Sequence, residues 1–267
     1  MSRIAGTFAA LRQKGRAALI PFVEAFDPSR NATLALLTGM AARGADIIEI
    51  GVPFTDPMAD GPTIQAAGRR ALTAGATLAG VLEIVREFRT ANGHTPLVLM
   101  GYLNPILSYG VEAFARDAAQ AGVDGLIVVD LPTEECDLLL PSAAANGLDV
   151  IRLIAPTTSD ERLPKVLAGS SGFVYYVSIT GVTGTRTASA SDLARDIPRI
   201  RRATSLPIAV GFGVRTPEQA AVVASYADAA IVASALIDKL CESDIDCVLD
   251  AVAALAEAIH SAAKIPA

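Results

Sequence analysis

The sequence is 267 residues long, 52% hydrophobic and only 19% charged, which excludes a disordered chain and suits one large domain or two small ones. Its formal net charge of −6 at pH 7 argues against nucleic acid or an anionic membrane as the main partner. No apolar run reaches the roughly 18 residues of a membrane span, and the first residues lack a signal-peptide pattern, so we expect a cytoplasmic protein.

Short aliphatic runs alternate with longer helical stretches along the whole chain. After a helical segment at residues 4–15, strands are predicted at residues 18–23, 47–50, 96–100, 125–129, 150–154, 173–178, 207–210 and 229–233. The helical stretches between or after them include residues 33–43, 78–89, 111–121, 193–202 and 245–262. Several strands follow a glycine or small residue and then an aspartate, a pattern typical of a helix end leading into a buried strand.

Eight strand and helix units in this length predict a single (β/α)₈ TIM barrel over residues 1–267, with an extra N-terminal helix covering its floor. The alternative is an open, doubly wound α/β sheet. No GxGxxG motif opens a helix after the first strand, and no linker divides the chain, so we favour the barrel. The three cysteines and two histidines show no disulfide or zinc spacing, so no metal is expected.

Glu49 is the first candidate catalytic residue, because it interrupts an otherwise apolar strand at residues 47–50. A lone buried carboxylate costs several kcal/mol unless a partner or a function accounts for it. Asp60 follows on a loop whose three prolines restrict its shape. Asp60 is either a turn residue or the second member of a carboxyl pair with separated pKa values, and Glu49 is either catalytic or part of an ion pair across the barrel.

Alternation along the other strands indicates which side chains share the barrel interior with Glu49. They are Met100, Tyr102, Ile127, Val129, Leu153 and Tyr175. These side chains predict an apolar cavity with aromatic residues at its mouth, which suits a flat apolar ring. The alternative is ordinary core packing.

A phosphate site is predicted late in the chain, where barrels often bind phosphate. The seventh strand ends in Gly211-Phe212-Gly213, the eighth is followed by Ser234, and the loop after the sixth carries Gly184. Exposed amides, a hydroxyl and a helix N-terminus together favour the binding of an anion. The alternative is that the glycines are needed only for the geometry of the turns. The long loop at residues 179–192 carries one cation, Arg186, and predicts a lid, the alternative being a loop with no gating role.

The stretch GADIIEIGVPFTDPMADGPTIQ at residues 44–65 resembles the α subunits of tryptophan synthase. The segments GYLNPI, AGVDGLIVVDLPTEE, FVYYVSITGVTG and PIAVGFGV extend this resemblance over essentially the whole chain. The resemblance implies a TIM-barrel lyase that cleaves indole-3-glycerol phosphate to indole and glyceraldehyde 3-phosphate without a metal or organic cofactor. It also implies a pyridoxal-phosphate β subunit as the partner, in an α2β2 heterotetramer.

The resemblance assigns roles by position and makes Glu49 and Asp60 the catalytic pair. The residues it places around the indole ring are Phe22, Tyr102, Leu153, Tyr175 and Phe212. Gly184, Gly213 and Ser234 are expected to hold the phosphate, and Thr183 and Arg186 to belong to the lid. The residues expected to contact the partner are Asp56, Pro57, Asn104 and Pro132.

The chain departs from the family pattern near the expected site. Glu24 and Phe26 stand where the family usually has a threonine and a glycine, Ile179 replaces an arginine, and Ala233 replaces a glycine. These departures bear on phosphate affinity, lid closure and communication with the partner. They keep two alternatives open, a catalytically weak subunit that only activates β and a free-standing indole-releasing lyase. Another phosphosugar barrel, such as an isomerase or epimerase of a ribulose or anthranilate phosphate, is the nearest enzymatic rival.

Overall fold

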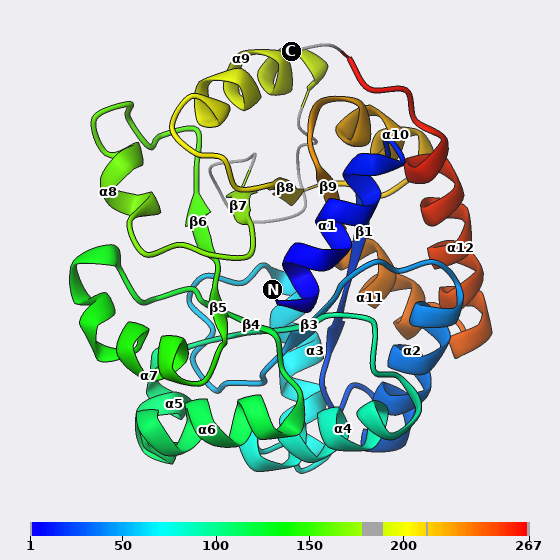
Figure 1. Cartoon of the computed structure of the whole chain (residues 1–267). Helices are drawn as coiled ribbons and strands as arrows, with labels where there is room; N and C mark the ends of the chain where they lie inside the picture. The colour runs from blue at the N-terminus through cyan, green and yellow to red at the C-terminus, as the bar shows by residue number, and fades with distance from the viewer. Residues whose placement is uncertain (1, 178–188, 212, 266–267) are drawn as a thin grey trace.

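A computed structural model describes residues 2–177, 189–211 and 213–265 of the chain. Its nine strands form one parallel sheet in the order β5-β4-β3-β2-β1-β9-β8-β7-β6, and helices lie around the outside (Figure 1). The strands are β1 (Ala18–Glu24), β2 (Ile48–Gly51), β3 (Leu97–Gly101), β4 (Gly125–Val128), β5 (Asp149–Val150), β6 (Arg152–Ile154), β7 (Val174–Val177), β8 (Ile208–Gly211) and β9 (Ala229–Val232). The predicted TIM barrel is confirmed.

The predicted fifth strand is divided into β5 and β6, which are the two ends of the sheet order. Residues 149–150 pair with β4, while residues 152–154 pair with β7. Strands of a closed barrel are tilted and staggered, so one strand meets its two neighbours at different heights. This single segment therefore closes the barrel.

The helices agree with the predicted stretches to within a few residues and add shorter ones. They are α1 (Arg3–Gln13), α2 (Arg30–Ala42), α3 (Pro62–Thr73), α4 (Leu78–Ala91), α5 (Leu103–Tyr109), α6 (Val111–Ala121), the 3₁₀ helix η1 (Thr133–Leu138), α7 (Leu140–Ala145), α8 (Leu163–Leu167), α9 (Ala190–Arg201), α10 (Pro217–Tyr226), α11 (Ser234–Glu242) and α12 (Ile245–Ser261). None of the helices described is long and apolar enough to cross a membrane.

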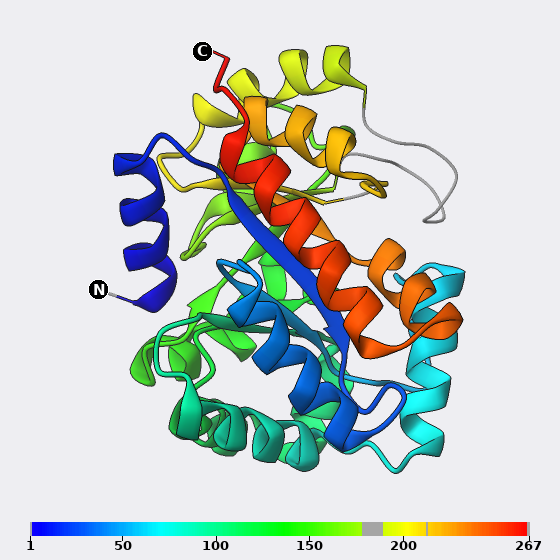
Figure 2. The same cartoon turned by 90° about the vertical axis from the view of Figure 1, so that its right-hand side faces the viewer.

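The N-terminal helix α1 closes the end of the barrel where the strands begin (Figure 2). Its buried residues Ile4, Phe8 and Leu11 belong to the same apolar cluster as the inward-facing strand residues. The rings of Phe8 and Phe173 lie 5.9 Å apart between centroids. The predicted cover over the barrel floor is thus present, and the opposite end is left for the site.

Aspartates at the start of strands tie neighbouring strands together at this floor. The carboxylates of Asp46, Asp124 and Asp228 accept the backbone N–H groups of Leu19, Leu97 and Ile208, at 2.8, 2.8 and 2.9 Å. In each pair the aspartate precedes one strand, and the amide belongs to the strand beside it. The recurring aspartate seen in the sequence is therefore a structural element of the floor.

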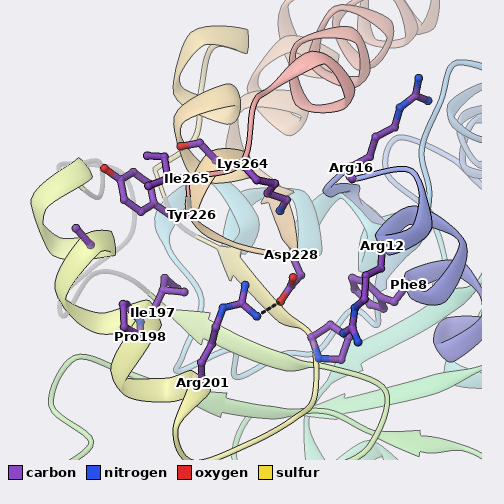
Figure 3. Close-up of a pocket in the computed structure, with 14 residues that line it drawn as sticks. Phe8, Arg12, Arg16, Ile197, Pro198, Arg201, Tyr226, Asp228, Lys264 and Ile265 are labelled. Carbon is purple, nitrogen blue, oxygen red and sulfur yellow. Dashed lines mark ion pairs between the residues drawn. The ribbon is translucent and has the colours of Figure 1, made fainter. Parts of the chain in front are cut away.

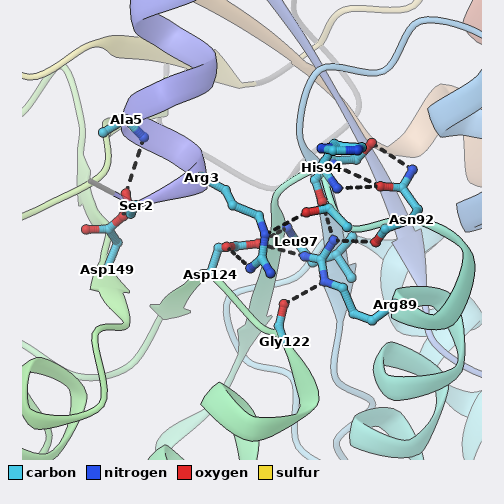
Figure 4. Close-up of polar contacts among 12 residues, drawn as sticks. Ser2, Arg3, Ala5, Arg89, Asn92, His94, Leu97, Gly122, Asp124 and Asp149 are labelled. Atoms are coloured by element: carbon cyan, nitrogen blue, oxygen red, sulfur yellow. Dashed lines mark hydrogen bonds and ion pairs between the residues drawn. The ribbon is translucent and has the colours of Figure 1, made fainter.

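Asp124 carries the largest of these networks (Figure 4). Besides the Leu97 amide, its carboxylate accepts hydrogen bonds from Arg89 and Arg3, each at 2.8 Å. Arg89 also donates to the carbonyls of Gly122 and Thr95 at 2.9 and 2.7 Å. The buried Asp124 thereby connects α1, α4, β3 and β4.

Candidate active site

The site is built at the carboxyl ends of β1, β2 and β3, where barrel active sites lie. Phe22 on β1 is level with Glu49 on β2, and Glu24 is level with Gly51. Side chains two residues apart share a face, so Phe22, Glu24 and Glu49 all face the interior. The inward orientation predicted for Met100, Ile127, Val129, Leu153 and Tyr175 is confirmed, since all five belong to the inner apolar cluster.

Glu49 is almost completely buried, with 1% of its surface exposed. Its Oε2 atom has no hydrogen-bond partner among the residues described, and no cation is paired with it there. Burial, reinforced by the nearby charge of Asp60, raises the pKa of Glu49 from 4.5 to about 8. Glu49 therefore holds a proton near neutral pH, and the ion pair considered for it in the sequence is absent from the described part of the chain.

Asp60 lies on the loop that joins β2 to α3. Two contacts hold this loop, since the Ala59 amide donates to the Tyr102 hydroxyl at 3.1 Å and the Gln65 side chain donates to the Asp60 carbonyl at 2.9 Å. Partial burial raises the pKa of the Asp60 carboxyl, while hydrogen bonding with the Tyr102 hydroxyl lowers it. Asp60 is thus placed beside Glu49 in a more polar setting.

Glu24 is a third carboxyl in the same place. It is 3% exposed and lines a small cavity with Phe22, Asp60 and Tyr102. Burial, followed by the charges of Asp60 and Asp27, raises the Glu24 pKa well above its ordinary value. In the sequence Glu24 stands out only as a departure from the family, although a carboxyl that ends an apolar strand is the same signal that singles out Glu49.

Gly51 makes room for Glu24. A Cβ atom at this position would lie 2.1 Å from Glu24 Oε2 and 2.5 Å from the tip of the Phe22 ring. Both distances are far shorter than a van der Waals contact, so only glycine fits beside these two side chains. The end of β2 is therefore shaped around the contents of the site.

Aromatic side chains border the site from two directions. Tyr175 on β7 is buried, and burial together with the charges of Glu49 and Asp60 raises its pKa well above 10. The rings of Phe54 and Tyr102 lie 5.3 Å apart between centroids. Phe54 does not stand out in the sequence, because it lies on a loop and the alternation that assigns strand residues to a face does not apply there.

The described parts of the expected phosphate site lie on neighbouring strands. Gly213 follows β8 with a φ of 73°, and Ser234 begins α11 directly after β9. The strands β8 and β9 pair in parallel, with Gly211 level with Ile231, so their carboxyl ends are adjacent. Four residues named for the site or the lid, Phe212, Thr183, Gly184 and Arg186, lie outside the described residues, as does Ile179.

The residues expected to contact a partner lie in the three consecutive segments that follow β2, β3 and β4, with Asn104 in the first turn of α5. Asp56, Asn104 and Pro132 are exposed, and Pro57 is half-buried beside the site. Of the five large apolar side chains exposed in the described part of the chain, three lie in these segments: Met58, Leu107 and Leu138, at 80%, 47% and 48% exposure. Exposed apolar side chains gathered in one region are typical of a protein interface.

A cavity of about 490 Å³ lies at the barrel floor beside α1 and α9 (Figure 3). It contains none of the residues singled out in the sequence. The candidate active site is nonetheless at the mouth, because the buried carboxyls and aromatic rings converge there.

Comparison with known proteins identifies the relatives of this chain. The family model for the tryptophan synthase alpha chain matches residues 8–264. The tryptophan synthase alpha chain of Acidiphilium cryptum is 72% identical over 97% of this chain and 98% of its own length, and that of Granulibacter bethesdensis is 65% identical over 98% of each. The crystal structure of tryptophan synthase subunit alpha from Legionella pneumophila is 39% identical, has a TM-score of 0.91, and covers 97% of this chain and 98% of its own.

Proposed function

Because this chain belongs to the tryptophan synthase alpha chain family, we propose that Glu49 and Asp60 carry out its reaction. The reaction is the retro-aldol cleavage of indole-3-glycerol phosphate to indole and glyceraldehyde 3-phosphate, which makes the chain a carbon–carbon lyase. The observation that carries the assignment is a buried, proton-holding Glu49 beside the more polar Asp60. Two carboxyls in different environments are suited to acid–base chemistry.

Glu49 supplies and then recovers one proton in this mechanism. Indole is a poor leaving group until its C3 carbon is protonated, and neutral Glu49 donates that proton. The carboxylate that remains takes the proton of the side-chain hydroxyl as the carbon–carbon bond breaks. The bonding electrons return to the ring, so indole and an aldehyde leave and Glu49 is protonated again.

Asp60 stabilises the charge that develops on the ring. Protonation at C3 gives the ring nitrogen a positive charge, and an ionised Asp60 accepts its N–H hydrogen bond. Burial raises the pKa of Asp60 above its ordinary value, and hydrogen bonding to Tyr102 opposes this rise and so favours the charged form. One carboxyl therefore changes state during the reaction while the other remains ionised.

The remaining assignments divide the substrate into a ring and a phosphate. The indole ring would lie against Phe22, Tyr102, Leu153, Tyr175 and Phe212. The phosphate would be bound by the amides of Gly184 and Gly213 and by Ser234 at the start of α11, with Thr183 and Arg186 on the covering loop. The adjacency of β8 and β9 supports this, since it brings two of these residues to one edge.

A β subunit is the partner of an alpha chain of tryptophan synthase, and we assign the docking surface to the loops after β2, β3 and β4. Asp56, Pro57, Asn104 and Pro132 would contact the partner, together with the exposed Met58, Leu107 and Leu138. We further propose an α2β2 assembly. Because the loop after β2 also carries Asp60, binding there would favour a closed, active arrangement of the site.

The substitution Glu49→Gln tests the mechanism. The amide keeps the volume of the side chain but cannot transfer a proton, so indole release should fall by at least about a hundredfold while indole binding is retained. The assay follows indole release from indole-3-glycerol phosphate, with and without a β subunit. Near-wild-type turnover in this variant would remove Glu49 from the mechanism.

A further inference from the structure

The cavity at the barrel floor, which we call the floor cavity, is separate from the site at the mouth. It lies among α1, α9, the end of α10 and the segment after α12, beside the residues that precede β8 and β9 (Figure 3). Its volume of about 490 Å³ is within the usual range of small-molecule sites. Much of its lining is apolar and comes from Phe8, Ile197, Pro198, Pro207, Tyr226 and Ile265.

The charged residues around the floor cavity are unbalanced. Four cations, Arg12, Arg16, Arg201 and Lys264, line it with a single carboxylate, Asp228. The local formal charge is therefore 4 − 1 = +3, on a chain whose net charge is −6. Positive charge concentrated in a concave region of an acidic protein favours an anionic ligand.

Asp228 offsets only one of the four cations, since its carboxylate is paired with Arg201. Its Oδ2 atom pairs with Arg201 at 3.0 Å and accepts the Ile208 amide at 2.9 Å. In the described part of the chain, Arg12 and Arg16 take part in no ion pair or side-chain hydrogen bond. Arg12 is thus left beside the cavity without a carboxylate, while the Arg16 side chain points away from it (Figure 3).

Lys264 brings a further cation to this cluster. Its ammonium donates to the Ala227 carbonyl, and the side chain reaches toward Asp228 from the side opposite Arg201 (Figure 3). Burial lowers the pKa of Lys264, the neighbouring Arg201 lowers it further, and Asp228 opposes both effects.

We propose that the floor cavity binds a small organic dianion, such as a phosphate monoester with an apolar body. Arg12, Arg201 and Lys264 would hold the anionic group, and Phe8 and Tyr226 would contact the apolar part. Such a ligand joins α1, α9 and the segment after α12, so it stabilises the fold in proportion to its occupancy. It does not compete with the substrate, because the two sites are at opposite ends of the barrel.

The test must separate this cavity from the phosphate site at the mouth. Ser234→Glu places a like charge where the substrate phosphate is expected and so blocks that site. Phenyl phosphate is then titrated into the Ser234→Glu chain by calorimetry at fixed ionic strength. We expect one binding site per chain to remain, accompanied by a rise in Tm.

Arg12→Glu, combined with Ser234→Glu, identifies the remaining site. It reverses a charge at the cavity and should weaken phenyl phosphate binding at least about tenfold. Lys14→Glu is the matched control, since Lys14 is exposed, caps the same helix and does not line the cavity. Phenyl phosphate binding to this control variant should change by less than about twofold.

Several results would overturn the proposal. One is the loss of all phenyl phosphate binding in Ser234→Glu alone. Another is equal weakening by Arg12→Glu and Lys14→Glu, which would indicate only the general charge of this face. Circular dichroism and indole release in the Arg12→Glu single variant, both expected to match wild type, exclude misfolding as the cause of weaker binding.

Discussion

Glu24 and Glu49 are buried carboxyls on neighbouring strands, and burial is the main cause of the raised pKa of each. Asp60 adds to both shifts through its own negative charge. Three carboxyls this close together cannot all ionise without strong repulsion. The site therefore disfavours the charged form of both glutamates and leaves Asp60 as the carboxyl best suited to hold a charge.

The stability of the protein should depend on pH through Glu49. The folded state raises the Glu49 pKa from 4.5 to about 8, so it binds this proton more tightly than the unfolded chain. The stabilisation is complete below pH 4.5 and is lost as the pH rises through about 8. Between these values the free energy of unfolding should fall more steeply in wild type than in Glu49→Gln, by about 1 kcal/mol per pH unit. Urea denaturation at several pH values measures this, and parallel curves would contradict it.

Asp60→Asn should slow the reaction and leave the fold intact. The amide cannot offer a negative charge to the ring nitrogen, so the barrier should rise by about 3 kcal/mol, the usual cost of losing one preorganised electrostatic contact. Steady-state kinetics with indole-3-glycerol phosphate measure the change in kcat/KM. If the substitution lowers Tm but leaves kcat/KM unchanged, Asp60 has only a structural role in the turn.

Gly51→Ala tests how tightly the site is packed around Glu24. The added methyl group would overlap Glu24 Oε2 and the Phe22 ring, which should destabilise the fold by about 1–3 kcal/mol. Glu24→Ala in the same chain removes one of the two overlaps and should recover part of the loss. Thermal denaturation of both single variants and the double variant gives the coupling energy, and simple additivity would contradict the packing argument.

At the scale of elements, the aspartates that precede strands connect segments that local propensity alone would not align. Asp46, Asp124 and Asp228 each accept an amide at the start of a neighbouring strand. Each of these amides lies at the beginning of a strand, where the neighbouring strand offers it no carbonyl. The aspartate carboxylate accepts its hydrogen bond instead, and so sets the strand register at the floor. The floor is thus specified by polar contacts in addition to the apolar packing of α1.

Asp124→Asn should be strongly destabilising for this reason. The substitution removes a buried charge that pairs with Arg89 and Arg3 at 2.8 Å each, leaving the largely buried Arg89 without its carboxylate. We expect a loss of about 3 kcal/mol in the free energy of unfolding. Asp250→Asn is the matched control, because Asp250 is 70% exposed and, among the residues that the structure describes, pairs only with Arg43, so it should cost less than about 1 kcal/mol. Equal effects in urea denaturation would contradict the argument.

At the scale of the whole molecule, the barrel separates stability from chemistry. The floor carries α1, the aspartate network and the floor cavity, while the mouth carries the three carboxyls, the aromatic rings and the exposed apolar side chains of the loops. Substitutions at the floor should therefore change Tm, and substitutions at the mouth should change turnover or the response to the partner.

Charge reversal at Asp56 tests the docking surface. Asp56→Lys should reduce the activation of indole release by the β subunit several-fold, measured against the same variant without β. Asp250→Lys makes the same charge change on α12, away from the mouth loops, and should leave the activation as in wild type. Equal activation of the two variants would show that the partner binds another surface.

The sequence alone determined the barrel and singled out Glu49 as the principal candidate residue, because both depend on short-range patterns. Alternation of apolar runs predicts strands that the structure confirms, and Glu49 stands out because a carboxyl contradicts its own strand. Phe212, Thr183, Gly184 and Arg186 lie outside the described residues and stay predictions.

Tertiary structure alone decided the rest. It divided the fifth strand between two neighbours, brought Glu24 beside Gly51 and Asp60, and gathered Arg12, Arg201 and Lys264 around one cavity. These residues are far apart in the chain, so no local period relates them. Their proximity follows from barrel closure, which sets the stagger of the strands and the ends at which distant segments meet.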